Sequence, residues 1–249
     1  MRNYILADIK RIFHKKTFPA TTGAYIGLFL IMIFIYFNPS FTTAAYVAKT
    51  TTFLSFFPLF VGLIVFLSVY YDDFKSKSMQ IAIGYGMPRY KVVLSKVVES
   101  FILLLAIIFV IGIAMLIIPA ILGMTLSRAQ VAELIASVIV EALRAIGYIC
   151  ISTIPVFYTQ NAVNGTILFV LLSSKTVMIL LSMMLGQDIL VNIVGDLTQY
   201  LYTSMLYSTR NMFVQTGTVN VLLFVALALY IVLPVILSVL GFRKKELEF

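Results

Sequence analysis

Four charged side chains stand inside otherwise apolar stretches of this sequence and could do chemistry there. Glu133, Glu141 and Arg144 fall within one apolar stretch, and Lys175 falls within the next. At 100° per residue along a helix, Glu141 lies about 80° and Arg144 about 20° from Glu133, so all three share one face. Two carboxylates on one face could act as a general acid and a general base, as an intramembrane protease or a lipid-modifying enzyme would require. The nearby arginine favours an ion pair over this enzyme hypothesis.

A charge at the centre of a membrane costs roughly 2.5–3.5 kcal/mol, so this face should meet a partner helix or a water-filled cavity. Glu141 and Lys175 would each lie about 15 Å from the same end of their helices. We expect Glu141 or Glu133 to pair with Lys175 or Arg144 and to line a pathway or a subunit interface. Two alternatives stay open: a buried neutral cluster that only sets helix register, or charges that meet water at the membrane surface.

The usual catalytic and ligand-binding motifs are missing from the sequence. It has no GxxxxGK[ST] phosphate loop, no HExxH metal motif and no plausible Ser/His/Asp set, and it has one cysteine and one histidine. We therefore expect no catalytic, cofactor-binding or metal site in this chain. If ATP drives its function, a separate subunit must bind ATP and magnesium.

The composition indicates a membrane protein. The chain has 249 residues, of which 61% are hydrophobic and 11% charged, against about 25% charged in soluble domains. So much apolar surface needs lipid, which excludes an ordinary soluble domain, a disordered chain and a disulfide scaffold. The net charge is +8, but the basic residues flank the apolar stretches, so nucleic acid is not an expected partner.

Six stretches are apolar and long enough to cross a membrane as helices, which needs about 20 residues each. The region 131–185 is too long for one span, and Pro155 with the polar cluster at 159–165 predicts a break between two. The predicted fold is a single all-α transmembrane domain over residues 1–249. Its six spans are 20–37, 51–71, 97–123, 131–157, 162–185 and 219–242.

The basic residues predict the orientation of these spans. Thirteen of the 18 lysines and arginines lie on the side where both chain ends fall, and three lie on the other side. Because cytoplasmic loops are enriched in Lys and Arg, both termini should be cytoplasmic, including the tail 243–249. The thirteen are Arg2, Lys10, Arg11, Lys15, Lys16, Lys75, Lys77, Arg89, Lys91, Lys96, Arg243, Lys244 and Lys245, and the three are Lys49, Arg128 and Arg210.

Two segments should lie along the membrane surface. In residues 1–19, Ile5, Ile9, Ile12 and Phe13 recur at helical spacing beside basic residues, which predicts an interfacial amphipathic helix. The outer segment 186–218, between the fifth and sixth spans, has apolar residues at helical spacing and only three charges. It predicts one or two short helices that lie on the outer leaflet or re-enter it.

The loop 72–96 is the most informative polar segment. Asp72 or Asp73 could cap a helix over 74–83, and Asp73 and Lys77 would lie four residues apart on one face. Gly84 and Gly86 should end this helix, and Pro88 suits the first turn of the next. The predicted helix–turn–helix would present Phe74, Met79 and Ile81 to a partner.

This loop resembles the first cytoplasmic loop of ABC type-2 exporter permeases, in which a coupling helix docks onto the ATPase subunit. The family tends to have Glu where this chain has Asp73. The resemblance, together with the spacing above, gives the predicted ATPase-coupling residues Asp73, Phe74, Lys77, Met79, Ile81, Gly84, Arg89 and Lys96. It rests on Asp73-Phe74-Lys75-Ser76-Lys77-Ser78, Ile83-Gly84-Tyr85-Gly86-Met87-Pro88-Arg89, Leu94-Ser95-Lys96 and the six-span plan.

The resemblance implies a non-enzymatic permease subunit in a bacterial cell membrane. Its implied partners are a cytoplasmic ABC ATPase, which binds ATP and magnesium, a second permease copy or paralogue, membrane lipid and an amphipathic substrate. The expected function is ATP-driven export of an amphipathic or hydrophobic substrate, with a bacteriocin-like or toxin-like peptide as the leading expectation. The alternatives are export of drugs, lipids or ions, or a non-transporting assembly, sensory or immunity subunit.

Overall fold

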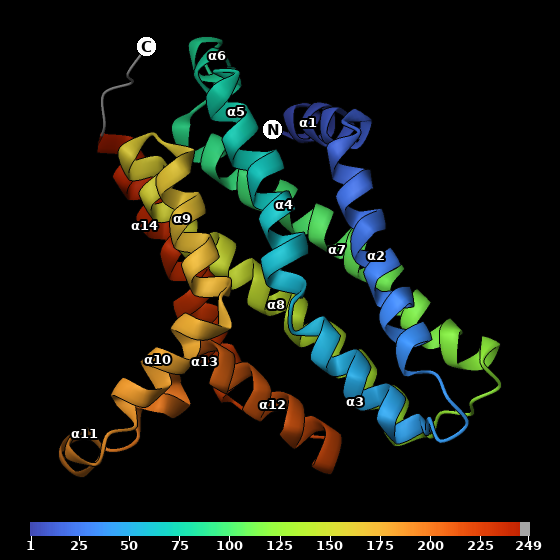
Figure 1. The fold of residues 1–249 in the computed structure, drawn as a ribbon. Coiled ribbons are helices and arrows are strands. Elements are labelled where there is room, and N and C mark those ends of the chain that lie inside the picture. Colours follow the sequence, from blue (N-terminus) through green and yellow to red (C-terminus); the bar gives the residue numbers. More distant parts are fainter. Residues whose placement is uncertain (245–249) are drawn as a thin grey trace.

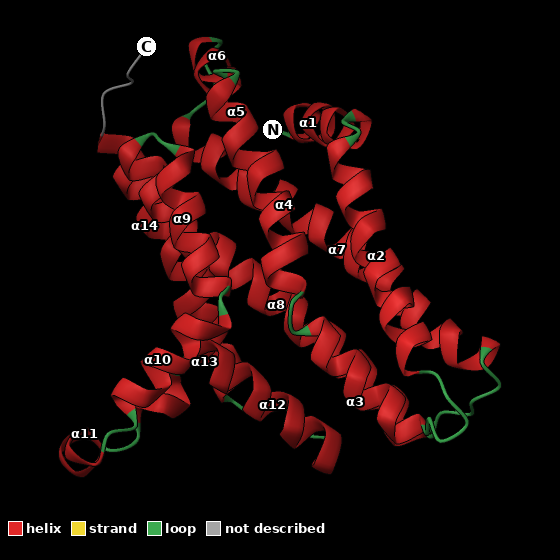
Figure 2. Ribbon diagram, in the orientation of Figure 1, coloured by secondary structure: helices red, strands yellow, loops and turns green. Residues whose placement is uncertain are grey.

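The computed structural model describes residues 1–244, and this part of the chain is helical with no β-strand (Figure 2). Five of its helices are long and apolar enough to cross a membrane, and a sixth stretch consists of two helices bent by 66° at a short break. The five are α2 (Thr17–Tyr36), Thr43–Lys75, α7 (Arg89–Ile121), α8 (Arg128–Thr159) and Leu222–Arg243, and the bent pair is α9 (Ala162–Ser173) with α10 (Lys175–Leu185).

Large apolar side chains cover the outside of this bundle. Phe34 is 81% exposed and Ile121 is 75% exposed. Less than a quarter of the apolar window in α2 and in the last long helix is buried inside the chain. Exposed apolar surface on this scale needs lipid or protein to cover it. The prediction of an all-α membrane protein is therefore confirmed.

The short helices gather at the two ends of the bundle (Figure 1). One end holds α1 (Arg2–His14), which lies across the bundle, together with α5 (Asp72–Lys75), α6 (Ser78–Gly84) and the end of α14 (Leu233–Lys244). The α2–α3 loop, α11 (Asp188–Val194) and α12 (Tyr202–Thr216) lie at the other end. Of the predicted tail, residues 245–249 lie outside the described part of the chain.

The second long helix is interrupted where the sequence predicted a continuous span. It starts as α3 (Thr43–Leu54), breaks at Ser55, and continues through two π-helical turns, Pro58–Gly62 and Leu67–Tyr71, on either side of α4 (Leu63–Phe66). Pro58 contributes to the break, because proline has no N–H to donate to the Leu54 carbonyl of the preceding turn. The Ser55 carbonyl at this break accepts a hydrogen bond from a side chain, Arg144.

The predicted break between residues 157 and 162 is confirmed, but α8 runs through Pro155 to Thr159, so the helix ends at the polar cluster and not at this proline. The chain turns at Gln160, whose φ is 53°, and the Asn161 side chain then accepts a hydrogen bond of 2.9 Å from the Val163 N–H to start α9. Pro155 lies only one turn from the end of α8. One missing backbone hydrogen bond there does not end the helix.

Residues 162–185, predicted as one span, form the two helices α9 and α10. The bend lies at Ser174, whose side chain accepts a hydrogen bond from the Thr176 N–H and caps α10. All residues of α10 remain exposed or half-buried. The bend separates α9, which buries one face that includes Gly165 and Phe169, from a helix that this chain leaves uncovered.

The helix α8 is the centre of the fold. It packs against α3, α7, α9, α12 and α14, and it carries the chain's one cysteine, Cys150, at 1% exposure. Close helix approach depends on glycine at Gly165 of α9, where an added Cβ would lie 2.8 Å from the Ser152 carbonyl oxygen and 2.9 Å from the Phe66 ring. The last long helix consists of α13 (Leu222–Leu227), a π-helical turn (Ala228–Val232) and α14.

The segment between α10 and the last long helix contains two α-helices and a 3₁₀ turn (Leu197–Tyr200). The first helix, α11, has no buried residue, and its Ile193 is 75% exposed. The second, α12, packs against α8 through buried side chains that include Tyr202 and Leu206. The helix α12 therefore forms part of the bundle rather than a separate surface layer.

Candidate functional site

The loop after the second span forms two short helices where the sequence predicted one helix over 74–83. The first, α5, continues the second span, and the second, α6, starts at Ser78 after Lys77 adopts a left-handed backbone with φ of 56°. The predicted capping by Asp72 or Asp73 is therefore wrong, because both residues lie inside a helix that has already begun. The predicted pairing of Asp73 with Lys77 is also replaced by other contacts.

A buried cluster of charges lies where α1, α5 and α7 meet. Its centre is Lys96, which is fully buried and whose ammonium binds the carboxylates of Asp8 and Asp73. Glu99, one turn further along α7, lies 2.9 Å from the same ammonium. Three carboxylates from three elements thus share one lysine, so the cluster fastens α1 and α5 to α7.

Further contacts extend this cluster across α1. Arg11 binds Asp73, and Tyr4 donates a hydrogen bond of 3.3 Å to the same carboxylate. Lys15 lies 2.6 Å from Asp72. The amphipathic helix predicted over 1–19 is therefore held against the loop by ion pairs as well as by its apolar face, which buries Ile5 and Ile12. Phe13, which was predicted on that face, is 48% exposed.

Several predicted coupling residues contact this chain itself. Asp73, Met79 and Lys96 are buried, so their side chains cannot reach a partner in this conformation. The Phe74 ring lies 6.3 Å from that of Phe157, and Arg89 donates a hydrogen bond of 3.0 Å to the Phe242 carbonyl.

The exposed residues of the loop form a different surface. Lys77, Ile81 and Gly84 are exposed, and Tyr85, which the sequence analysis did not single out, is 90% exposed. We call Ile81 and Tyr85 the loop tip. An apolar side chain on α6 and an aromatic side chain directly after it, both exposed, are suited to contact another protein.

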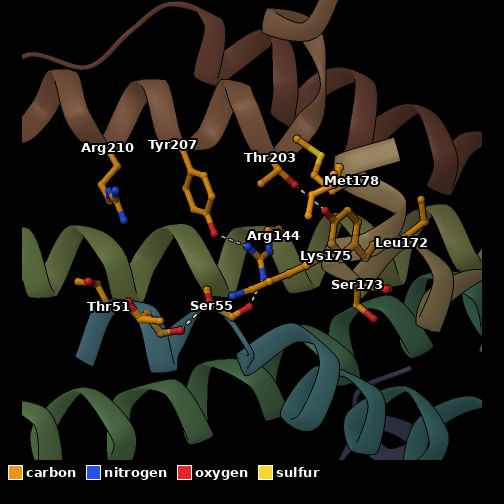
Figure 3. A pocket seen from close by; sticks show the side chains of 14 residues that line it. Thr51, Ser55, Arg144, Leu172, Ser173, Lys175, Met178, Thr203, Tyr207 and Arg210 are labelled. Carbon is orange, nitrogen blue, oxygen red and sulfur yellow. Dashed lines mark hydrogen bonds between the residues drawn. The ribbon is translucent and has the colours of Figure 1, made fainter. Parts of the chain in front are cut away.

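A cavity of about 410 Å³ lies between α3, α8, α10 and α12, towards the end where α11 lies. Its wall carries the cations of Arg144, Lys175 and Arg210, each from a different helix. Figure 3 shows these three side chains together with the hydroxyl groups that complete the polar wall. Hydroxyl groups come from Thr51, Thr52, Ser55, Tyr148, Ser173, Ser174, Thr203 and Tyr207, and apolar groups from Leu172, Met178 and Ile179.

Arg144 is held in place at the edge of this cavity by three partners. Its guanidinium lies 3.1 Å from the Glu141 carboxylate, and it donates hydrogen bonds to the Tyr207 hydroxyl and to the Ser55 carbonyl freed at the break after α3. The Tyr207 hydroxyl donates a hydrogen bond of 2.8 Å to Glu141. Burial and the Glu141 carboxylate raise the pKa of Tyr207, so its phenol remains a donor.

The predicted partnership of Lys175 with a glutamate is not formed. Its ammonium lies 4.0 Å from the centre of the Phe56 ring, and within residues 1–244 it has no carboxylate partner. Glu133 is half-buried and likewise has no ion pair in this part of the chain. The predicted charges therefore divide into one pair, Glu141 with Arg144, and two residues that stand apart from it.

Four residues of these sites were not predicted from the sequence: Asp8, Glu99, Tyr207 and Arg210. A signal existed for Asp8, since it is the only acid in the basic segment and follows Ile5 by three residues on the face that becomes buried. Glu99 carried a signal as the only charge near the start of an apolar span. The two α12 residues carried none, because the short helices predicted in 186–218 were expected at the membrane surface and not against α8.

Comparisons with protein-family models, curated proteins and solved structures found no match to this chain.

Proposed function

We propose that this chain is the membrane subunit of an ATP-driven exporter of the ABC type-2 permease class. In this proposal the α6 end of the bundle is cytoplasmic, and the loop tip docks onto a separate ATPase subunit that binds ATP and magnesium. Two copies, or one copy and a paralogue, form the transport pathway. When the two ATPase subunits bind ATP and close against each other, they would push on α6 and thereby change the shape of the pathway.

The observation that carries this proposal is the fastened loop. An element that transmits force needs an exposed contact surface and a rigid connection to the bundle. The loop tip supplies the surface, with Tyr85 at 90% exposure. The buried cluster around Lys96 supplies the connection, because it joins the loop to α1 and α7 through several ion pairs.

The membrane plan supports the same proposal. If α9 and α10 together form one bent span, the chain crosses the membrane six times and both ends lie on one side. The basic residues then make that side cytoplasmic by the positive-inside rule. We further propose that α11 re-enters the outer leaflet, because none of its apolar residues is buried in the bundle.

The proposed cargo is an amphipathic or hydrophobic molecule, with a bacteriocin-like or toxin-like peptide as the leading candidate. Export of drugs, lipids or ions and a non-transporting assembly, sensory or immunity role are the alternatives. A transporter requires ATP hydrolysis that a substrate stimulates in the purified complex. A non-transporting subunit would bind the ATPase without such stimulation.

Replacing Tyr85 with alanine is expected to weaken binding of the ATPase subunit by at least about tenfold, because truncation of an aromatic residue at the centre of an interface costs about 2 kcal/mol or more. Folding should be unaffected, since this side chain is almost fully exposed. The measurement is the affinity between purified permease and each ABC ATPase encoded beside its gene, in detergent with a non-hydrolysable ATP analogue.

Tyr200→Ala is the matched control, because Tyr200 is also an exposed tyrosine, at 51%, and lies in the turn between α11 and α12. It should bind the ATPase like the unmodified chain. If Tyr85→Ala and Ile81→Asp both bind the ATPase with unchanged affinity, the loop tip is not the docking site. If no ATPase binds the unmodified chain, the exporter proposal itself is wrong.

A further inference from the structure

The charges on the cavity wall are not balanced. Arg144 has its counterion in Glu141, but within residues 1–244 neither Lys175 nor Arg210 forms an ion pair. The cavity wall in this part of the chain includes no aspartate or glutamate. The cavity therefore presents positive charge to whatever occupies it.

Both cations rest on weaker contacts that leave their charge available. The Lys175 ammonium lies 4.0 Å from the Phe56 ring centre. The Arg210 guanidinium lies 5.2 Å from the Tyr207 ring centre and donates to the neutral Asn211 side chain at 3.1 Å. A cation within a membrane domain is costly unless it meets water or an anion, so an anionic ligand here would stabilise both side chains.

Arg144 forms the buried side of the cavity, where it is 4% exposed and is held by Glu141, Tyr207 and the Ser55 carbonyl. Phosphate and carboxylate oxygens are the acceptors that guanidinium groups bind best.

Part of the cavity wall is apolar. Leu172, Met178 and Ile179 line it, and Ile179 is 57% exposed on α10, which has no buried residue. An alkyl chain that leaves the cavity along α10 would cover this surface. The volume of about 410 Å³ falls in the range of about 300–1,000 Å³ that is usual for small-molecule sites.

We infer that this cavity binds the anionic headgroup of an amphiphile, a phosphate or carboxylate carrying an alkyl chain, between Arg144, Lys175 and Arg210. This inference deepens the proposed function, because it assigns a negative charge to the molecule that is exported or that regulates export. Its role in transport rests on the proposed function. The binding site itself can be tested without any ATPase.

The probe is dodecyl phosphate, titrated by calorimetry into the full chain purified in a neutral maltoside detergent. Dodecylphosphocholine is the matched ligand, because it has the same chain and phosphate but no net charge. We expect dodecyl phosphate to bind at least about tenfold more tightly, and binding to weaken as salt is added. Equal binding of the two ligands would overturn the inference.

The matched variants are Lys175→Gln and Arg210→Gln, with Lys49→Gln as the control. Lys49 is a lysine of α3 that lies 4.1 Å from the Tyr36 ring and away from the cavity wall. Each cavity variant should weaken dodecyl phosphate binding about tenfold, the size of one lost charge-assisted contact, and the control should not. Lys175 is exposed, so the Lys175→Gln variant should fold normally. Unchanged dodecyl phosphate binding in both cavity variants would contradict the inference.

A competition arm distinguishes the two sources of such a ligand. If phosphatidylglycerol added to the micelles displaces dodecyl phosphate, the site binds an anionic membrane lipid. If phosphatidylglycerol does not displace dodecyl phosphate, the site selects an anionic amphiphile with a single alkyl chain. Displacement and its absence both support an anion-binding site. Failure of the Tyr85 experiment with retained dodecyl phosphate binding would remove the exporter proposal and leave this site in place.

Discussion

Replacing Lys96 with alanine is expected to destabilise the folded chain by about 3–5 kcal/mol, the largest effect we expect from a single substitution. The variant removes the one cation shared by Asp8, Asp73 and Glu99. Arg11 still pairs with Asp8 and Asp73, but the buried Glu99 keeps no cation among the described residues. Removing one partner of a buried ion pair costs this much because the remaining charge has lost its counterion. The measurement is the free energy of unfolding in mixed micelles, followed by circular dichroism as SDS is added.

The matched control is Lys91→Ala on the same helix. Lys91 is half-buried, lies 6.0 Å from the Tyr90 ring centre and has no ion pair among residues 1–244. Its replacement should change the free energy of unfolding by no more than about 0.5 kcal/mol. Equal stability of the two variants would show that the cluster at Lys96 does not hold α1 and α5 in place.

Replacing Gly165 with alanine is expected to cost about 1–3 kcal/mol through overpacking between α8 and α9. The new methyl group would overlap Val156 and would lie 2.8 Å from the Ser152 carbonyl oxygen. Side chains can rotate away, but a helix backbone can relieve this contact only if α9 moves. The same unfolding measurement gives the change, and the apparent melting temperature in detergent should fall with it.

Gly112→Ala is the control for this substitution. An added Cβ at Gly112 would meet Val138 at 3.6 Å, an ordinary contact distance. Because alanine favours a helix by about 1 kcal/mol over glycine, this variant should be as stable as the unmodified chain or more so. If both glycine variants gain stability, close packing at Gly165 is not required by the fold.

Much of the fold could be predicted because the membrane limits how its elements can be built. An apolar stretch of about 20 residues must become a helix to satisfy its backbone in lipid. This rule located α2, α8 and the last long helix within a few residues, whereas α7 begins at Arg89, well before the predicted span 97–123. The bend at Ser174 was missed, since it lies at a Ser-Ser-Lys sequence without glycine or proline. Short helices were predicted in the segment that holds α12, but the packing of α12 against α8 was not, because spacing along the segment does not indicate contacts with another helix.

The candidate sites could be predicted less well, because spacing along a helix reports only local neighbours. The pair Glu141–Arg144 lies within one helix, three residues apart, and was among the expected pairs. Asp73 was assigned to Lys77 by the same argument, but its partners Arg11 and Lys96 come from other helices. Burial of Asp73 and Lys96 follows from how α1 covers the loop, which no spacing rule indicates.

The buried position of Cys150 has a practical consequence for establishing orientation. The chain has no other thiol, and 1% exposure leaves this one closed to reagents in the folded protein. A cysteine placed at Tyr85, or at Asp188 at the start of α11, would therefore be labelled selectively without removing the native residue. A maleimide that cannot cross membranes, applied to intact cells, should modify Asp188→Cys and leave Tyr85→Cys unlabelled if the α6 end faces the cytoplasm.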